Sequence, residues 1–216
     1  KNDMSVTYLL HNAEDEKSLC QNSINVLYKD QDQIIWAGTF KNGLSYYHRK
    51  ITRFKLNQHQ VTDPNSLPFN DINAIAEDEA QNLWIGTNGG GLLYYDRKNN
   101  TYKQFLHDPE NPNSLTTNVI VSLCLDRDDK LWIRTYFGGL LSFDGNRFVR
   151  YKHNPEDPSS LSDNSIWEIF EDSGGNLWIG TLSQGADMFD RKKKVFVHYN
   201  LEGANPIHAS YIPAFM

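Results

Sequence analysis

The chain has 216 residues, of which 39% are hydrophobic and 22% charged, and its formal net charge is −6. This composition is ordinary for a globular protein that buries a sizeable core, and a net negative charge without a long Lys/Arg block argues against a nucleic-acid-binding surface. No run approaches the roughly 18 apolar residues that span a bilayer, and residues 1–5 lack the apolar stretch of a signal peptide, so we expect any export signal to lie outside this chain.

One sequence unit recurs four times along the chain. A phrase that begins with Trp and ends three residues later with Thr starts at Trp36, Trp84, Trp132 and Trp178, in steps of 48, 48 and 46 residues. Several other columns keep the same register, namely Leu19, Leu67, Leu115 and Leu161; Asn22, Asn70, Asn118 and Asn164; Ile24, Ile72, Ile120 and Ile166; Gly43, Gly91, Gly139 and Gly185. Repeats of this length indicate a propeller, a solenoid or another array rather than a single wound domain.

In chain order, a partial copy precedes the four complete ones and another follows them. Residues 6–11, within the segment 1–17, align with residues 102–107 and predict the fourth strand of a preceding unit. The complete copies are residues 18–65, 66–113, 114–159 and 160–205. In the last segment, 206–216, residues 211–216 predict the first strand of a following unit. We therefore expect a segment of a longer array, and because unpaired strand edges tend to find partners, either the two ends pair or two chains assemble.

Each copy predicts four antiparallel strands. In the second copy these are residues 72–77, 83–87, 92–95 and 101–105, separated by polar and glycine-rich turns. In the third copy Asp144-Gly145-Asn146 shortens the third turn, which explains the 46-residue step. No segment has helical periodicity, so the sequence predicts an all-β fold, a β-propeller of four-stranded blades.

The turns between the second and third strands are where the copies differ most. In a propeller these turns share one face with the connections between blades, and that face usually binds ligands. Our candidate ligand-binding residues lie in these turns or in the strands beside them, and are led by residues that break the repeat and that the scaffold does not require: Tyr136, Phe137, Arg134, Trp167, Lys41, Asn88 and Gln184. Aromatic faces stack on sugars and the polar side chains can bind hydroxyls or a uronate. The alternatives are packing between blades or a local ion pair for Arg134 and Trp167, and contact with an adjoining domain for Tyr136 and Phe137.

The repeated polar residues have simpler interpretations. His11, His59, His107 and His153 lie too far apart in successive blades to share a zinc ion, so we expect each to bond its own blade connection. We expect Asp30, Asp78, Asp126 and Asp172 to cap turns, because the loops lack the ligand spacing of a calcium site. Residues 88–91 predict a hairpin and not a phosphate loop. Cys20 and Cys124 stand at unrelated repeat positions and are expected to be free thiols. No cofactor or metal is predicted.

The compound motif resembles the two-component regulator propeller repeat, with the best matches at Asn82–Asp96 and Asn176–Thr181 and departures at Arg134, where the family has Gly, and His48, where it has Asp. The resemblance covers about residues 6–216. It implies the periplasmic sensor region of a hybrid two-component system of Bacteroides-type bacteria, in which two propellers usually precede a β domain, a membrane helix, a histidine kinase, a receiver and a DNA-binding region. It further implies oligosaccharide recognition that is reported to the kinase. None of the later parts is in this sequence.

Two other functions stay open at this point. The first is a structural or protein-interaction propeller of a secretion or surface system. The second is a propeller enzyme of the streptogramin lyase type, which would need a catalytic His and Glu clustered on one face. The non-repeating histidines argue against it, because His48 is expected in a third turn, His198 in an outer strand and His208 in a terminal connection. We therefore predict a non-catalytic chain that contacts neighbouring blades or domains but neither nucleic acid nor a membrane.

Overall fold

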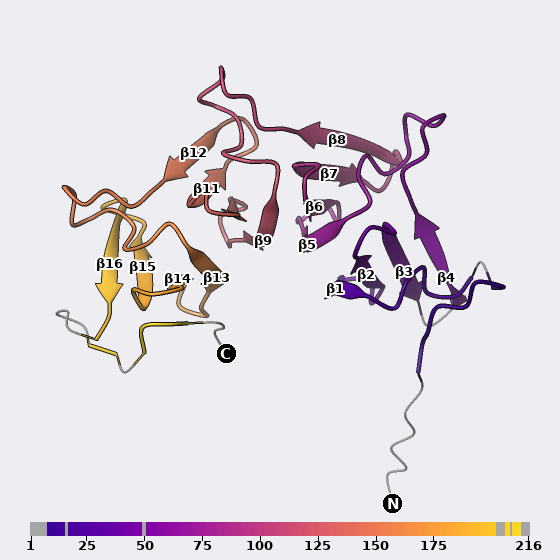
Figure 1. The fold of residues 1–216 in the computed structure, drawn as a ribbon, viewed down its shortest axis with the longest axis horizontal. Helices are drawn as coiled ribbons and strands as arrows, with labels where there is room; N and C mark the ends of the chain where they lie inside the picture. Colours follow the sequence, from indigo (N-terminus) through magenta and orange to yellow (C-terminus); the bar gives the residue numbers. More distant parts are fainter. Residues whose placement is uncertain (1–7, 16, 49–50, 202–205, 208, 213–216) are drawn as a thin grey trace, which may run out of the picture.

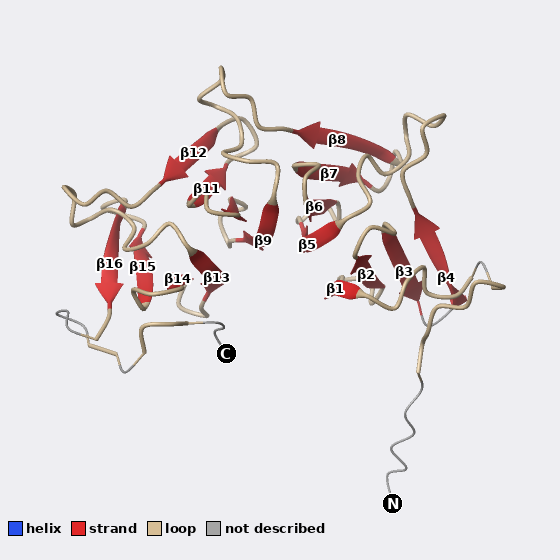
Figure 2. Cartoon of the chain, in the orientation of Figure 1, coloured by secondary structure: helices blue, strands red, loops and turns tan. Residues whose placement is uncertain are grey.

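The computed structural model describes residues 8–15, 17–48, 51–201, 206–207 and 209–212. These residues form strands, turns and loops and no helix (Figure 2). The strands make four antiparallel sheets of four, each in sequence order. Blade 1 holds β1 (Ile24–Lys29), β2 (Ile35–Thr39), β3 (Leu44–His48) and β4 (Ile51–Asn57). Blade 2 holds β5 (Ile72–Glu77), β6 (Leu83–Thr87), β7 (Leu92–Asp96) and β8 (Thr101–Phe105). Blade 3 holds β9 (Ile120–Leu125), β10 (Leu131–Thr135), β11 (Leu140–Phe143) and β12 (Phe148–Tyr151). Blade 4 holds β13 (Ile166–Glu171), β14 (Leu177–Thr181), β15 (Ala186–Asp190) and β16 (Val195–Tyr199).

The four blades stand side by side in an open arc, with the first strands β1, β5, β9 and β13 on its inner side and the fourth strands on its outer side (Figure 1). This confirms the predicted β-propeller architecture. Blades 1 and 4 form the two ends of the arc, and in the part of the chain that the structure describes the two ends do not pair. Of the two arrangements expected for the ends, pairing within one chain is therefore not seen, and assembly of two chains stays a prediction.

The terminal segments differ from the expectation. Residues 8–11 form no strand, and residues 6–7 lie outside the described residues. Residues 211–212 also form no strand, and residues 213–216 lie outside the described part. Ile212 nevertheless lies against Gly180 of β14, where its Cγ2 would be 3.0 Å from a Cβ added to that glycine. Ile72 and Ile120 approach Gly38 and Gly86 in the same way, at 2.6 Å. The C-terminal segment thus begins the contact that a next blade would make.

The core lies between the blades, because each sheet is apolar on both faces. One cluster joins blades 1 and 2 through Trp36, Ile72 and Ile85. Similar clusters join blades 2 and 3 around Leu92 and Ile120, and blades 3 and 4 around Trp132 and Ile169. The glycines in the second strand are required here, since a side chain at Gly86 would collide with Ile120 and hold the sheets apart.

The repeated histidines and asparagines close the long connection before each blade. Nδ1 of the four histidines lies 2.6–3.1 Å from the carbonyl oxygens of Leu19, Leu67, Leu115 and Leu161. The backbone N–H of each histidine donates to the side-chain oxygen of the repeated asparagine at 2.6–2.8 Å. The predicted structural role of the histidines is confirmed.

The repeated aspartates cap the turn between the first and second strands, as expected. Each accepts a hydrogen bond from a backbone N–H four residues later, at 2.8–2.9 Å. In blades 1, 3 and 4 the other carboxylate oxygen also accepts from Nε1 of the repeated tryptophan, at 2.8, 2.7 and 2.9 Å. In blade 2 the hydroxyl of Tyr94 takes that place and donates to Asp78 at 2.8 Å.

Blade 4 contains a histidine–aspartate pair in which the aspartate is buried and the histidine half-buried. His198 Nδ1 lies 2.7 Å from Oδ1 of Asp187, which is fully buried, and Nε2 lies 2.8 Å from the carbonyl oxygen of Pro158. Both ring nitrogens donate only when the ring is protonated. The hydrogen bond to Asp187, against the opposing effect of burial, raises the pKa of His198 above its ordinary value.

We predict that this pair makes the domain more stable at mildly acidic pH than at alkaline pH. A histidine whose pKa is raised in the folded state stabilises the fold fully below its unfolded pKa of about 6.5, and the contribution is lost as pH rises through the folded pKa. Urea unfolding from pH 5 to 9 should show this loss for the native chain and a smaller one for His198→Gln. Parallel curves for the two proteins would contradict the prediction.

Candidate functional site

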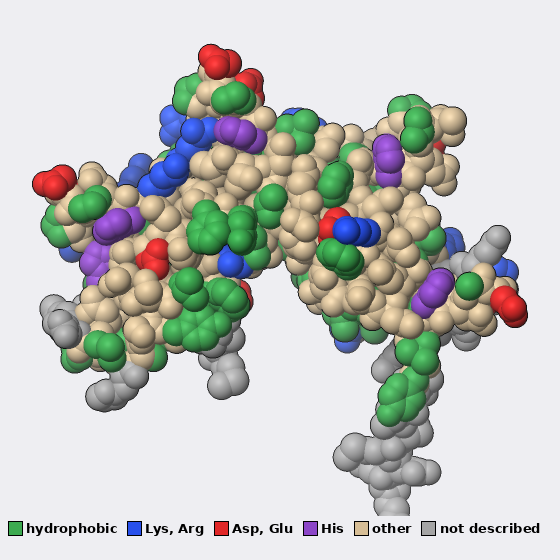
Figure 3. Space-filling view, viewed as in Figure 1, with side chains coloured by type: hydrophobic (Ala, Val, Ile, Leu, Met, Phe, Trp, Pro, Cys, Tyr) green, Lys and Arg blue, Asp and Glu red, His purple; other side chains and the backbone are tan. Residues whose placement is uncertain are grey.

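The second turns and the lead-in to each first strand lie on one face of the arc. The backbone N–H groups of Phe40, Asn88, Tyr136 and Leu182 donate to carbonyl oxygens of Ser23, Asp71, Val119 and Ser165 at 2.9–3.1 Å. These bonds tie each second turn to the residue that precedes its own first strand. The candidate residues on the turns therefore share one face, as predicted, and Figure 3 shows hydrophobic side chains gathered on that face over blades 3 and 4.

One exposed apolar group on this face is the aromatic cluster, formed by Tyr136, Phe137, Trp167, Leu182 and Tyr211. Tyr136 and Phe137 are 59% and 68% exposed and Trp167 is 41% exposed. The ring centroids of Tyr136 and Phe137 are 4.4 Å apart, and those of Trp167 and Tyr211 are 5.5 Å apart, both pairs edge to face. A cavity of about 80 Å³ opens between them and is also lined by Arg134 and Ile166.

Two residues of the cluster stand at unusual positions. Phe137 has a φ of 51°, in the left-handed region, which is uncommon for a bulky side chain. Trp167 occupies an exposed position of β13, where β1 and β5 carry Asn25 and Asn73. An exposed tryptophan at a position that two other blades fill with asparagine, next to other exposed aromatic residues, indicates a binding surface.

Arg134 has a role in joining blades. In the first two junctions an asparagine bridges the blades: Asn25 Nδ2 donates to the carbonyl oxygen of Ile72 at 3.0 Å, and Asn73 Nδ2 to that of Ile120 at 2.9 Å. Blade 3 has Val121 at this position, and Arg134 Nε donates to the carbonyl oxygen of Ile166 instead. Arg134 thus replaces the missing asparagine, which is the packing role that the sequence left open.

The guanidinium of Arg134 also forms one wall of the aromatic cluster. Its carbon lies 5.5 Å from the centroid of the Trp167 ring. Burial lowers the pKa of Arg134 from its ordinary value, against the attraction of Glu168, and burial raises the pKa of Glu168. The site therefore combines aromatic faces with a partly buried cation, and it can offer stacking together with hydrogen bonds to hydroxyl or carboxylate oxygens.

Lys41 and Asn88 come together at a second place, between blades 1 and 2. They line a groove of about 410 Å³ with Phe69 and Asp71. Asn88 Nδ2 donates to Oδ2 of Asp71 at 3.1 Å, and Lys41 Nζ lies 4.6 Å from the centroid of the Phe40 ring. The surface of this groove is mainly apolar, and the groove shares no lining residue with the cavity of the aromatic cluster.

Gln184 lies at a third place, at the C-terminal end of the arc. It lines a cavity of about 210 Å³ with Asn200 and Ser210. The seven candidate residues therefore share a face but not a single site, and their role in binding stays a prediction. Sequence reasoning missed Phe69, Asp71, Leu182 and Tyr211. Phe69 was detectable, since it breaks the repeat where other copies carry Gln21, Thr117 and Asp163.

The other polar candidates lie where a structural role accounts for them. The described residues contain no group of three or more His, Cys, Asp or Glu side chains that could hold a metal ion. Both cysteines are free, and burial raises the pKa of Cys124 to about 11. His198 lies in the outer strand β16, as predicted, whereas His48 ends β3 and does not lie in the third turn. His208 lies outside the described residues.

The repeats match a known family. Residues 18–41, 66–89, 114–137 and 160–183 match the two component regulator propeller. The chain is built of two-component regulator propeller repeats. Each matched segment runs from the end of the long connection through the first two strands into the second turn, so the propeller repeat contains both the capping aspartate and its tryptophan.

Solved structures support the same assignment. The extracellular domain of a hybrid two component system from B. thetaiotaomicron is 25% identical and superposes with a TM-score of 0.73, over 88% of this chain and 25% of that one. Virginiamycin B lyase from Staphylococcus aureus is 14% identical with a TM-score of 0.59, over 83% of this chain and 56% of the lyase. PorZ, a surface component of the type-IX secretion system of Porphyromonas gingivalis, is 18% identical with a TM-score of 0.55, over 77% of this chain and 24% of PorZ. The last two likenesses show the fold alone.

The chain spans about a quarter of the length of the B. thetaiotaomicron extracellular domain. No curated protein matches the chain. Among the described residues there is no helix of the length and apolarity that crossing a membrane requires. The repeats and the similarity to that extracellular domain identify a propeller of the sensor type found in hybrid two-component systems.

Proposed function

We propose that this chain is a non-catalytic part of a periplasmic sensor that binds an oligosaccharide on the aromatic cluster and passes the signal to a histidine kinase. The exposed cluster carries the proposal, because Tyr136, Phe137 and Trp167 present open ring faces at positions where the repeat does not need them. Sugars offer C–H faces to aromatic rings and hydroxyls to nearby donors such as Arg134. The similarity to the B. thetaiotaomicron extracellular domain supports a sensing role.

The test is a comparison of two aromatic variants on an array of neutral and uronate-containing oligosaccharides. We expect the native chain to bind a subset of the array and Tyr136→Ala to weaken that binding about tenfold or more, the loss expected for removing a stacked ring at the centre of a site. Phe40→Ala is the matched control. Phe40 occupies the same turn position in blade 1 and is 41% exposed, but it lies far from the cluster along the arc. Isothermal titration would then give the affinities.

The outcomes separate this proposal from a purely structural propeller. Loss of binding in Tyr136→Ala alone supports a glycan site on the aromatic cluster. Equal losses in both variants would place binding elsewhere. Absence of binding across the array, with both variants folded, would favour the alternative in which the cluster contacts another domain or a surface-system partner.

A further inference from the structure

Two of the three junctions between blades are locked by an arginine on the face opposite the aromatic cluster. Arg97 follows β7 of blade 2, and its Nη1 lies 3.1 Å from Asp30 Oδ2 of blade 1 and 3.3 Å from Glu77 Oε1 of its own blade. Arg191 follows β15 of blade 4, with Nη1 2.6 Å from Asp126 Oδ2 of blade 3 and Nη2 2.9 Å from Glu171 Oε1. Both arginines thus bind the upstream capping aspartate and the acid that ends their own first strand.

The same arginines share one further contact, and Arg97 makes another. Arg97 Nη1 donates to the carbonyl oxygen of Gln81 at 3.1 Å, and Arg191 Nε donates to that of Gly175, the equivalent residue, at 3.0 Å. The guanidinium carbon of Arg97 lies 5.4 Å from the centroid of the Trp36 ring. The repeated guanidinium site is therefore built from carboxylates and a carbonyl, and at the junction between blades 1 and 2 an indole face is added.

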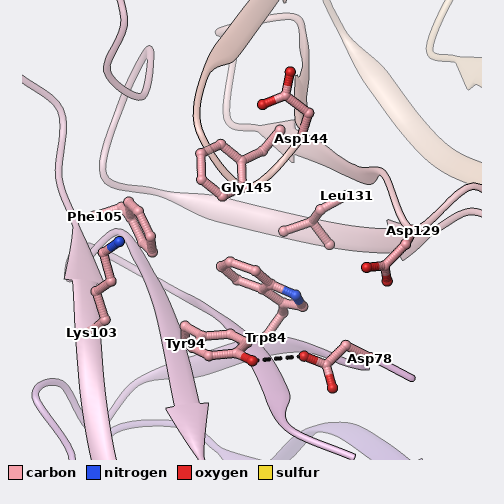
Figure 4. A pocket seen from close by; sticks show the side chains of 10 residues that line it. Asp78, Trp84, Tyr94, Lys103, Phe105, Asp129, Leu131, Asp144 and Gly145 are labelled. Atoms are coloured by element: carbon pink, nitrogen blue, oxygen red, sulfur yellow. Dashed lines mark hydrogen bonds between the residues drawn. The ribbon is translucent and has the colours of Figure 1, made fainter. Parts of the chain in front are cut away.

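The middle junction, between blades 2 and 3, has no such arginine. The shortened third turn of blade 3 places Gly145 where Arg97 and Arg191 stand in their blades, and Leu125 stands where Glu77 and Glu171 do. A Cβ added to Gly145 would have nothing within 4 Å. A cavity of about 300 Å³ occupies this position, and Gly145 itself lies on its wall (Figure 4).

Like the junction between blades 1 and 2, this cavity has an indole and a capping aspartate on its walls. The indole of Trp84 and the rings of Phe105 and Phe143 form its apolar surface. Because Tyr94 and not Trp84 donates to Asp78, the indole is turned into the cavity (Figure 4). Trp84 thereby offers a face equivalent to the Trp36 face on which Arg97 lies.

The cavity also carries excess negative charge. Asp78, Asp129 and Asp144 line it, and Asp129 is the residue equivalent to Gln81 and Gly175. Burial and the nearby carboxylates of Asp78 and Glu79 raise the pKa of Asp129. The cation on the wall is Lys103, whose Nζ lies 4.7 Å from the centroid of the Phe105 ring, on the opposite side from Asp129 (Figure 4).

We propose that the cavity between blades 2 and 3 binds the guanidinium group of a ligand, in the place that Arg97 and Arg191 fill at the neighbouring junctions. The ligand guanidinium lies against Trp84 and pairs with Asp78 and Asp129. Because it bridges two blades, the bound ligand stiffens the middle of the arc. This site is independent of the aromatic cluster, which lies on the other face.

The test is calorimetric titration with arginine amide and with citrulline amide, which has the same shape but a neutral urea group. We expect arginine amide to bind at least about tenfold more tightly, because only the cation forms charge-assisted hydrogen bonds. Asp129→Asn should reduce the affinity for arginine amide about tenfold. Asparagine fits the backbone there, since Asp129 has a φ of 57°.

Asp108→Asn is the matched control for the loss of one negative charge. Asp108 caps a turn in the long connection by accepting from Glu110 N at 3.0 Å, and the equivalent positions in other copies carry Asn12 and Asn154 with the same bond. This variant should bind arginine amide like the native chain. Lys103→Gln, which removes the cation on the wall of the cavity, should bind arginine amide more tightly than the native chain does.

Equal binding of the two amides, or no binding of arginine amide to the folded native chain, would overturn the proposal. Equal affinities for Asp129→Asn and Asp108→Asn would also overturn it. A blocked Gly-Arg-Gly peptide separates the two sources of the group: binding as tight as that of arginine amide indicates an arginine side chain of a polypeptide, and weaker binding indicates a small guanidinium compound. Failure of glycan binding on the aromatic cluster would leave this site unaffected.

Discussion

Arg191→Leu is expected to lower the free energy of unfolding by about 3 kcal/mol, because removing one partner leaves a buried charge without its counter-ion. Arg191 pairs with Asp126, whose side chain is fully buried, and with Glu171, which is nearly so. Burial alone would raise the pKa of Asp126, yet hydrogen bonds from Trp132 and Arg191 lower it below its ordinary value. The ion pair therefore stabilises the fold at neutral pH, and its contribution is lost as pH falls through the acidic range.

Urea denaturation of the native chain and the variant measures the effect. Lys192→Leu is the control, since Lys192 is the next residue and is exposed. A surface change of this kind is expected within about 0.5 kcal/mol of the native chain. If the two variants were equally stable, the arginine would not lock the junction between blades 3 and 4.

Trp132→Ala is expected to lower the free energy of unfolding by about 4 kcal/mol, through the cavity left by a large core side chain. Trp132 is fully buried and packs edge to face on Phe189 with ring centroids 5.1 Å apart. It also donates from Nε1 to Asp126 at 2.7 Å, so the substitution removes a hydrogen bond to a buried carboxylate.

Trp84→Ala is the matched control for this prediction. Trp84 occupies the same repeat position, but it is only half-buried and lines the open cavity between blades 2 and 3. In the same denaturation experiment, Trp84→Ala should lower the free energy of unfolding clearly less than Trp132→Ala does. Equal losses would show that packing of the repeated tryptophan does not depend on the junction it faces.

The blade architecture could be predicted from the sequence because its determinants are local. The capping aspartate and its tryptophan are six residues apart, and the histidine and the leucine carbonyl that it bonds are eight residues apart. Such short separations leave the same spacing in every copy, so four copies in register reveal the strands, the turns and the face on which the second turns lie. The terminal strands could not be predicted, since a strand forms only where a partner strand exists.

The candidate site could be predicted only in part. Breaks in the repeat pointed to Tyr136, Phe137 and Trp167, which the structure shows to be exposed. The same breaks also pointed to Arg134, which the structure places in a bond to Ile166 because blade 3 lacks the bridging asparagine. A break in a repeat does not distinguish a ligand-binding residue from a residue that compensates for a second break elsewhere.

The sequence alone determined the repeat, its four strands and the residues that hold each turn, since these depend on bonds within one copy. The tertiary structure decided which residues meet across the junctions: Arg97 with Asp30, Arg191 with Asp126, and an open cavity where Gly145 takes the arginine position. These contacts join residues of adjacent copies. They depend on how neighbouring sheets are rotated and on which way a side chain such as Trp84 turns. The spacing of a repeat determines neither of these.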